Sequence, residues 1–293
     1  MPPPASAART GTKPATMARR DRAAERNGVQ SGYWQDLTTT DFAGLDPEST
    51  VALLPVAAIE QHGPHLPLST DAVIADEIVR ALLAGRAPDG PTLLVLPLAA
   101  VGHSPEHASF AGTLTARAET LLALWTEIGR SVASAGVRKL ILLNSHGGQK
   151  SLVDIVATRL RAEHGLLVVR ASTFSMGAPP GLFEPRELAL GLHGGDVETS
   201  LMLHLRPDLV RRDRIRDFIG LPERFADEHE LLGAEKPVGF GWLSEDLHPD
   251  GAVGRAGGAS AEKGARCFEH IVGRFQRLVD EVAATPLEVL RGR

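Results

Sequence analysis

The sequence has almost no cysteine and no long apolar run. Its one cysteine among 293 residues, Cys267, has no disulfide partner within the chain, which fits the reducing conditions of the cytoplasm. Cys267 lies in a segment with the apolar spacing of a helix, so we expect it to be packed and unreactive. No apolar stretch approaches the roughly 20 residues that a membrane-spanning helix needs. These absences predict a cytoplasmic protein that does not span a membrane.

The sequence also lacks an excess of basic residues. It contains 31 Lys and Arg against 36 Asp and Glu, a formal net charge of -5, and so it has no electrostatic footprint for nucleic acid. Hydrophobic residues make up 43% of the chain and charged residues 23%, as in ordinary globular proteins. A chain of 293 residues suffices for one large domain or two modest ones.

Large apolar residues are nearly absent from the first 30 residues. This segment is rich in Pro, Ala, Arg and Thr, and it cannot bury enough surface to offset the entropy that it would lose on ordering. It also lacks the apolar core of a secretory signal. No later change of composition marks a linker, and no internal repeat is found. We therefore predict a flexible tail over residues 1–30 and one catalytic domain over residues 31–293.

Several familiar catalytic motifs are missing. The sequence has no GxSxG elbow and no GxxxxGK[ST] phosphate-binding loop. The segment "GFGWLS" at 239–244 lacks the strand and helix that flank a dinucleotide-binding turn. Ser145 and His146 are neighbours on a predicted strand end, where adjacent side chains point apart, so they do not suit a catalytic dyad.

What the sequence does contain is an alternation of strand and helix patterns. Apolar runs bounded by turn residues predict buried strands at 51–58, 92–100, 137–144 and 166–172. Helical apolar spacing predicts helices at 70–85, 118–136, 149–165, 196–207 and 259–283. Such alternation predicts an α/β fold, a single three-layer domain with a mostly parallel sheet flanked by helices. The irregular stretch 208–258 is expected to form loops that shape a pocket or a subunit contact.

Polar residues gather where the predicted strands end. "IEQHGPH" follows the first strand, "VGHSPEHASFAGT" the second and "NSHGGQ" the third, and "HGGDVETS" opens a later helix. Six of the eleven histidines lie in these four segments. Because ligands of open α/β sheets bind beyond the carboxyl ends of the strands, we expect these clusters to share one site.

The residue types in these clusters suit a divalent metal. Glu60 and His62 are two apart, so in extended backbone they point to the same side, and Asp71 returns at the start of the next helix. Carboxylates and imidazoles together favour zinc, manganese or iron. Two ions that share a hydroxide would supply a nucleophile at neutral pH. Each side chain alone is more often an ordinary surface group, and it is their convergence that favours a metal site. Other polar groups of these segments are expected to hold the ligands in place: His65, His103, Glu106 and His107.

The motifs resemble those of the creatininase family of metal-dependent amidohydrolases. The resemblance rests on "PVAAIEQHGPHLPLSTD", "NSHGGQ" and "HGGDVETS", with "GHSPEHASFAGT" between them, and it covers roughly residues 33–280. It implies a single α/β domain, often assembled into hexamers, that hydrolyses C–N amide bonds. Activities in the family include creatinine ring opening, formamide removal and trimming of a modified precursor peptide.

The resemblance also implies roles for individual residues. Glu60, His62 and Asp71 would be metal ligands, with Asp71 between two ions, and His146 would be the fourth protein ligand. His193 would lie near the substrate as a proton donor. Glu198 would be a ligand or an orienting carboxylate with a part in catalysis. A further set is expected to support the ligands or contact the substrate: His65, Glu106, His107, Ser145, Gly147 and Gly148.

The sequence departs from creatinine-hydrolysing members in two places. Those proteins have Tyr and Glu directly after the metal-binding histidine, and that Glu binds the second ion, whereas this chain has Gly147 and Gly148. They also carry tryptophans before the histidine that matches His193, whereas "EPRELALGLHGG" contains none. Both departures argue against creatinine as the substrate, and Glu198 is the predicted replacement ligand.

These observations predict a hydrolase that acts on a small cyclic or formamide-type amide through a metal-bound hydroxide. Two alternatives stay open: a peptidase that trims a short modified peptide, and a non-catalytic metal-binding subunit of the same fold. Two divalent ions per subunit are expected, zinc, manganese or iron. The expected partners are a small amide substrate and further copies of the chain, in a hexamer by resemblance.

The spacing of His193 and Glu198 carries its own prediction. The two are five apart, which would place them on different faces of a continuous helix. If Gly194 and Gly195 are not helical, His193 can fold back over the helix, with Gly195 or Asp196 as its N-cap. Glu198 would then lie in the first turn and point into the same cleft as Asp71. The alternative is that Glu198 only caps its own helix.

Overall fold

The computed structural model describes Met1 and residues 29–291. The predicted tail, residues 1–30, lies almost wholly outside the described residues, so the tail and the domain boundary after it stay predictions. Within the described part of the chain, no helix is both long and apolar enough to cross a membrane.

A five-stranded parallel sheet forms the middle layer, in the order β1-β3-β2-β4-β5. All four predicted apolar runs form strands, and a short first strand joins them at the edge. The strands are β1 (Gly32–Tyr33), β2 (Val51–Val56), β3 (Leu93–Val95), β4 (Lys139–Asn144) and β5 (Leu167–Ser172). β3 is shorter than the predicted 92–100 because Pro97 has no N–H to donate to the ladder, although the backbone of Leu96 and Ala99 still bonds to β2.

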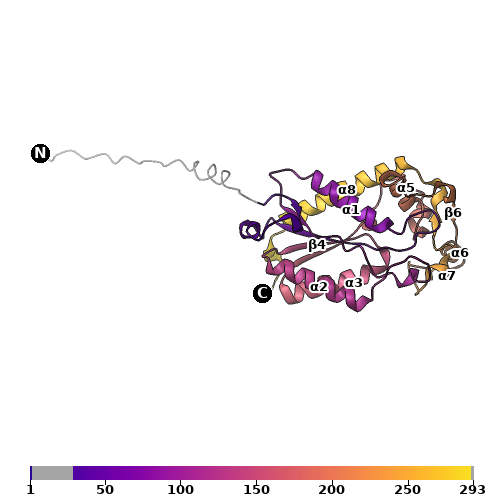
Figure 1. Ribbon diagram of the computed structural model, residues 1–293, viewed down its shortest axis with the longest axis horizontal. Coiled ribbons are helices and arrows are strands. Elements are labelled where there is room, and N and C mark those ends of the chain that lie inside the picture. Colours follow the sequence, from indigo (N-terminus) through magenta and orange to yellow (C-terminus); the bar gives the residue numbers. More distant parts are fainter. Residues whose placement is uncertain (2–28, 292–293) are drawn as a thin grey trace.

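Helices cover both faces of the sheet and complete three layers (Figure 1). Alternate residues of β2 point to opposite sides, so Val51 and Leu53 join the core under α1, α5 and α8, while Ala52, Leu54 and Val56 join the core over α2 and α3. The five long helices match the predicted ones to within a few residues: α1 (Thr70–Ala84), α2 (Ala118–Ser134), α3 (Lys150–His164), α5 (Asp196–Leu205) and α8 (Ala261–Ala284). The predicted α/β three-layer fold is confirmed.

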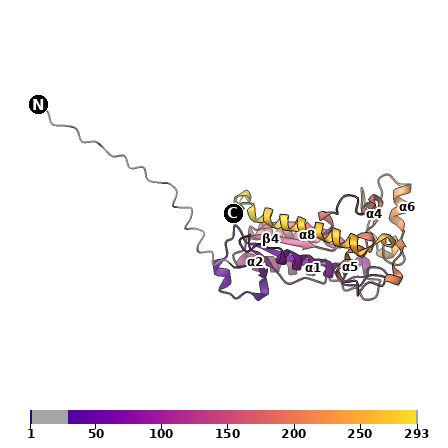
Figure 2. The same ribbon diagram turned by 90° about the horizontal axis from the view of Figure 1, so that it is seen from above.

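The last long helix runs along one face of the sheet (Figure 2). Its Cys267 is fully buried, and burial raises the pKa of the thiol to about 12, as expected for a packed and unreactive cysteine.

Small elements that the sequence pattern did not reveal lie at the carboxyl end of the sheet (Figures 1 and 2). They are α4 (Pro185–Leu190), β6 (Asp217–Phe218), α6 (Leu221–Glu228), α7 (Ser244–Leu247) and β7 (Gly254–Arg255), with β6 and β7 antiparallel. Apolar side chains of this region remain exposed in the single chain: Ile219, Leu231, Val238 and Leu243. The predicted oligomer stays a prediction.

A buried lysine fastens the amino end of the sheet. Lys139, the first residue of β4, is fully buried, and its ammonium donates to the carbonyls of Glu48 (2.5 Å), Ala283 (2.8 Å) and Thr285 (2.6 Å). Two of these carbonyls belong to the end of α8, where helical carbonyls lack partners. The lysine therefore joins β4 to the last helix.

The strand order creates a crevice at the opposite end of the sheet. β2 and β4 are neighbours, but the chain leaves β2 for α1 on one face and leaves β4 for α3 on the other. Segments that follow the two strands thus diverge and leave room between them, which is where α/β sheets bind ligands.

Candidate metal centre

Five acidic and histidine side chains meet at this crevice. Glu60 and His62 lie just beyond β2, and His146 lies just beyond β4. Asp71 is the second residue of α1, and Glu198 is the third residue of α5. We call these five residues the metal cluster. They are the side chains that the sequence analysis assigned as ligands, and the structure brings them together.

The metal cluster is almost completely removed from solvent. Its members have exposed fractions of 1% for Glu60, 0% for His62, 2% for Asp71, 3% for His146 and 5% for Glu198. Burying three carboxylates without compensation costs several kcal/mol per charge, on the order of the stability of a whole domain. The cluster therefore requires positive charge close to its oxygens.

Asp71 occupies the middle of the cluster. Its Oδ1 lies 3.3 Å from His62 Nε2, and its Oδ2 lies 3.5 Å from His146 Nδ1. One carboxylate thus presents its two oxygens to two imidazoles from different strands. This is the arrangement that a carboxylate between two ions needs.

Hydrogen bonds to the backbone assign the tautomers of both imidazoles. His62 donates from Nδ1 to the carbonyl of Glu60 (3.1 Å), and His146 donates from Nε2 to the carbonyl of His103 (2.9 Å). In the neutral rings, the other nitrogens, His62 Nε2 and His146 Nδ1, therefore carry lone pairs. Both nitrogens face carboxylate oxygens, and a lone pair facing a carboxylate oxygen is repelled unless a proton or a metal ion lies between them.

Three buried atoms of the cluster have no hydrogen-bond partner among the described residues. They are Glu60 Oε2, His62 Nε2 and Asp71 Oδ2. Buried polar atoms in native proteins are normally paired, so three unpaired atoms in one cluster call for a bound group. All three are lone-pair donors of the kinds that zinc, manganese and iron accept. The residues present therefore fit a divalent metal.

The ligand atoms sort into two groups that share Asp71. Glu60, Asp71 and His146 form one group, and His62, Asp71 and Glu198 form the other. Within each group, the ligand atoms lie within 4.8 Å of one another. Two neighbouring ions with a common carboxylate would satisfy both groups, as the sequence analysis expected.

Charges within the cluster shift the pKa values of its members. Burial alone would lower the pKa of His62, but the carboxylates of Asp71, Glu198 and Glu60 outweigh it and raise that pKa to about 9. Burial would raise the pKa of Asp71, but His62 and His146 hold it at about 2. Protons and metal ions therefore compete for the same imidazole nitrogens, and metal affinity is expected to fall as the pH falls.

Glu198 combines the two roles that its position in the sequence suggested. Its Oε2 accepts a hydrogen bond from the backbone N–H of Gly194 (2.6 Å), just before the N-cap Gly195. Its Oε1 lies 4.0 Å from His62 Nε2, inside the cluster. Burial, with the charges of Asp71 and Glu60, raises the pKa of Glu198 to about 7. Oε2 thus stabilises the start of α5, and Oε1 is available to bind a metal ion.

His193 lies over the cluster, as the two glycines after it allow. Gly194 has a φ of +65°, a conformation that favours glycine, and His193 pairs through its backbone with Val253. The His193 ring donates from Nε2 to the carbonyl of Gln61 (2.5 Å), while Nδ1 lies 3.9 Å from Glu60 Oε1. Burial, followed by repulsion from His62 and His107, lowers its pKa well below the usual range. His193 is therefore neutral, with a free Nδ1 that must take up a proton before it can donate one.

His107 supports Glu60 from the second-strand loop. The side-chain amide of Gln61 donates to His107 Nδ1 (2.7 Å), and Ser244 Oγ lies 2.6 Å from the same nitrogen. The proton of this ring therefore lies on Nε2, which faces Glu60 Oε1 at 3.3 Å. A nitrogen that carries a proton cannot bind metal, so His107 orients a ligand.

His65 acts on the other side of the site. Its Nε2 donates to the carbonyl of Gly194 (3.0 Å) and contacts Thr199 Oγ1 (2.9 Å), and its ring stacks on Phe218. It therefore holds the turn that carries His193 and does not itself reach the cluster.

The other predicted positions divide into those near the cluster and those away from it. Glu106 Oε1 lies 3.4 Å from His146 Nε2, and the backbone of Gly147 and Gly148 is exposed beside His146. Ser145 Oγ lies 3.5 Å from the carbonyl of Val56, so this hydroxyl faces the β2 backbone and away from the metal ligands. His103 bonds to the carbonyl of Ala116 and braces its own loop.

Sequence reasoning missed two buried residues that organise the site. Gln61 bonds to His107 and to the carbonyl of Gly251. Glu187 accepts from the backbone N–H groups of Asp196 and Arg255, which ties the start of α5 to β7. In the sequence, each of them is only a polar residue that lies within or beside one of the recognised motifs.

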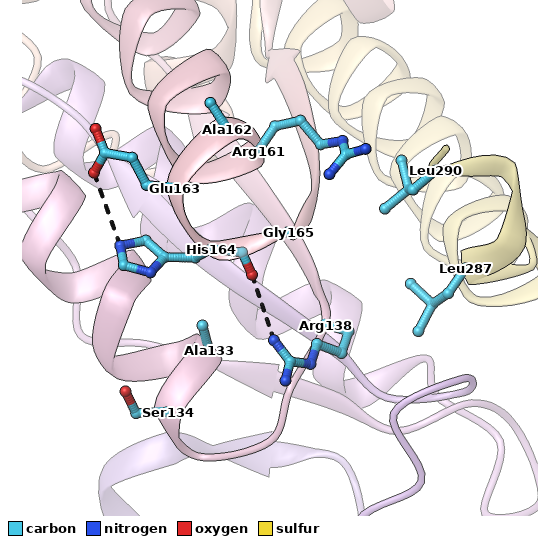
Figure 3. Close-up of a pocket in the computed structure, with 10 residues that line it drawn as sticks. All are labelled: Ala133, Ser134, Arg138, Arg161, Ala162, Glu163, His164, Gly165, Leu287 and Leu290. Atoms are coloured by element: carbon cyan, nitrogen blue, oxygen red, sulfur yellow. Dashed lines mark hydrogen bonds and ion pairs between the residues drawn. The ribbon is translucent and has the colours of Figure 1, made fainter. Parts of the chain in front are cut away.

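A surface hollow lies elsewhere, at the amino ends of the strands (Figure 3). It is lined by the ends of α2 and α3 and by residues near the C-terminus, including Arg138, Arg161, His164 and Leu287. His164 and Glu163 point along its wall, 4.0 Å apart, and Arg138 donates to the carbonyl of His164. The hollow brings together no group of metal ligands among the described residues, so the chemistry belongs to the crevice.

Comparison with known proteins gives a family and several relatives. The family model Creatininase, described as creatinine amidohydrolase, matches residues 35–279. The mycofactocin precursor peptide peptidase of Mycobacterium ulcerans is 35% identical over 241 residues, covering 81% of this chain and 87% of that protein. The creatinine amidohydrolase of Pseudomonas putida is 32% identical over 200 residues, covering 63% of this chain and 74% of that protein.

Solved structures share the fold. A mutant creatininase complexed with creatine has a TM-score of 0.70 and 26% identity, covering 87% of this chain and 100% of that chain. A manganese form of creatininase has a TM-score of 0.68 and 27% identity, covering 86% of this chain and 98% of that chain. Another solved structure is a mutant creatininase described as the Zn-Zn type.

Proposed function

This chain belongs to the creatininase family of hydrolases, and we propose that it cleaves an amide bond of a short peptide in a metal-dependent reaction. The sequence predicts a small cyclic or formamide-type amide as the substrate, with a short peptide as the alternative. The relatives now favour the alternative, because several peptidases of 31–35% identity match 80–81% of this chain.

The observation that carries the proposal is the open backbone beside His146. Gly147 and Gly148 are exposed, and a side chain at position 147 would meet no atom within 4 Å. Creatinine-hydrolysing members, by resemblance, carry Tyr and Glu there. Gly147 leaves room for the main chain of a peptide to approach the cluster, and its amide group can bond to it.

The residues of the chain divide the work of the reaction. Metal bound by the cluster supplies a Lewis acid for the scissile carbonyl and a water of lowered pKa. His193 is neutral and has a free Nδ1, so it can take the proton from water as the water oxygen attacks the carbonyl carbon. The carbon–nitrogen bond then breaks, and His193 returns the proton to the leaving nitrogen.

The burial of the site favours this chemistry. Gln61 holds the His193 ring through its carbonyl, which fixes the nitrogen that faces the substrate. Because the cluster residues are at most 5% exposed, bulk water is excluded and the charges act at low dielectric. His193, which acts first as the base and then as the acid, is thus positioned before the substrate binds.

The test is a substrate panel with the metal-loaded chain. Short peptides that differ in their terminal residues, creatinine, other lactams and formamides are incubated, and the products are analysed by mass spectrometry. We expect a peptide to be cleaved and creatinine to be left intact. Turnover of only lactams or formamides would overturn the peptidase proposal in favour of a small amide. Failure of the whole panel with metal bound would favour a non-catalytic subunit.

A matched variant ties turnover to this site. His193→Ala should retain its metal, because this ring is expected to serve the substrate, and it should lose about 10²–10⁴-fold in turnover. Wild-type turnover by this variant would remove His193 from the mechanism.

A further inference from the structure

Two buried amide side chains, Asn144 and Gln149, lie on either side of His146 and its two glycines. Asn144 is the last residue of β4, and Gln149 is the N-cap residue of α3. Their exposed fractions are 1% and 0%. Burying an amide costs free energy unless its oxygen and its nitrogen are both hydrogen-bonded, so the partners of these two side chains indicate what they hold in place.

Asn144 holds the main chain of His146 on both sides. Its Oδ1 accepts from the backbone N–H of His146 (3.1 Å), and its Nδ2 donates to the carbonyl of His146 (2.7 Å). An asparagine that bonds to the backbone two residues later mimics a backbone turn. The side chain therefore fixes both peptide groups that flank this metal ligand, just where the strand ends.

Gln149 fixes the orientation of the Asn144 amide. Its Oε1 accepts from the backbone N–H of His103 (3.2 Å), and its Nε2 donates to the carbonyl of Ala57 (3.3 Å) and to Asn144 Oδ1 (2.9 Å). A backbone N–H only donates and a carbonyl only accepts, so both amides have a single orientation. A Cβ built at Gly102 would lie 2.6 Å from Gln149 Oε1, so the second-strand loop leaves this amide no room to turn.

These hydrogen bonds close into a circuit around His146. The imidazole donates from Nε2 to the carbonyl of His103 (2.9 Å), and the N–H of His103 donates to Gln149. His146 is thus held at its N–H, at its carbonyl and at one ring nitrogen. The other ring nitrogen, Nδ1, is left facing Glu60 Oε1 (3.1 Å) and Asp71 Oδ2 (3.5 Å).

We propose that Asn144 and Gln149 are positioning residues for His146, and that they hold its Nδ1 in place for a metal ion. A ligand that is fixed before metal arrives loses little conformational freedom on binding, and this raises metal affinity. The hydrogen bonds of the two amides reach the backbone and each other, so their effect on a metal must pass through His146. The proposal concerns metal binding and does not depend on which amide bond is cleaved.

The test measures Co²⁺ binding to the full chain after chelation, followed by the visible d–d bands. Gln149→Met roughly keeps the side-chain volume but removes the amide, and it should weaken Co²⁺ binding about 10–100-fold. Asn144→Ala is a milder second variant, since Gln149 keeps its backbone partners, and it should weaken binding in the same direction. Gln276→Met is the matched control, because it removes an amide that bonds to Leu82 in the core under α8, and its Co²⁺ affinity should equal that of the wild type.

A double-mutant cycle separates positioning from general support of the fold. In the His146→Ala background, with titrations extended to millimolar Co²⁺, Gln149→Met and Asn144→Ala should cause little further loss of affinity, because the residue through which they act is gone. In the His62→Ala background they should cause their full loss. Unchanged Co²⁺ affinity in both single variants, or an equal loss in the His146→Ala background, would overturn the proposal. Neither outcome bears on the peptidase proposal, whose readout is cleavage.

Discussion

His65 should make the domain sensitive to mild acid. Its ring is buried, and its Nδ1 has no hydrogen-bond partner among the described residues. Burial, with repulsion from His62 and Arg216, lowers the pKa of His65 from 6.5 to about 4. The folded state therefore favours the neutral ring. Because the folded pKa lies below the unfolded one, the stabilisation is complete above about pH 6.5 and is lost as the pH falls towards 4.

The magnitude follows from the two pKa values. Between pH 7 and pH 4.5 the unfolded chain takes up a proton that the folded ring mostly refuses, which removes about 2 kcal/mol from the free energy of unfolding. In His65→Phe the ring can still stack on Phe218 but cannot titrate. This variant should lose about 1 kcal/mol at pH 7 for the hydrogen bond to Gly194, and should then lose less than wild type on acidification.

The assay is urea unfolding in the presence of a chelator at pH 7 and pH 4.5, followed by circular dichroism. The quantity of interest is the stability difference between wild type and His65→Phe, because other groups titrate equally in both. Thr199→Val is the matched control: it removes the hydroxyl that contacts His65 but keeps the imidazole, so its acid sensitivity should match that of wild type. A wild-type-minus-variant difference that is the same at both pH values would refute the reasoning.

Two further predictions concern the site and the core. Glu198→Gln should reduce turnover by roughly two orders of magnitude, because an amide cannot both accept from Gly194 and offer a charged oxygen beside His62. Its cost in thermal stability should stay at or below about 1 kcal/mol. Normal steady-state turnover would show that this residue only caps its helix. Gly129→Ala should cost about 1–3 kcal/mol in urea unfolding, because its Cβ would lie 2.3 Å from Leu160 and force α2 away from α3. Gly32→Ala, whose Cβ would meet nothing within 4 Å, is the control, and equal stabilities of the two variants would contradict the packing argument.

The ligand cluster was predictable because a parallel sheet brings the ends of its strands together. The apolar runs before Glu60 and His146 predicted two strands, and parallel strands must place the residues that follow them at one edge. Asp71 and Glu198 start helices that return to that edge. Neither inference required knowledge of the loops between the elements.

The orientation of His193 was only partly predictable. The two glycines after it predicted a turn, and Gly195 at the N-cap agrees with the structure. The sequence predicted a proton donor, but it did not show that the ring must first take up a proton. The hydrogen bond to the carbonyl of Gln61 and the burial of the ring depend on segments far apart in the sequence, and they make it neutral.

The stretch 208–258 resisted prediction for a physical reason. Its helices α6 and α7 are too short to be stable alone, so their sequences carry little periodic signal. Isolated tertiary contacts hold the stretch in place, such as the backbone pairing of Val253 with His193. The contact between Glu106 and His146 was hidden for the same reason, because it depends on where two loops meet.

The buried ammonium of Lys139 means that β4 cannot be completed by residues that are synthesised at the same time as this strand. Two of its three acceptors belong to Ala283 and Thr285, which are translated 144 and 146 residues after Lys139. While the ribosome still covers those two residues, the amino end of β4 would hold a charge with most of its acceptors missing. The domain should therefore complete its fold only after α8 has left the ribosome, and ribosome-bound chains that lack α8 should be cut by protease within the sheet.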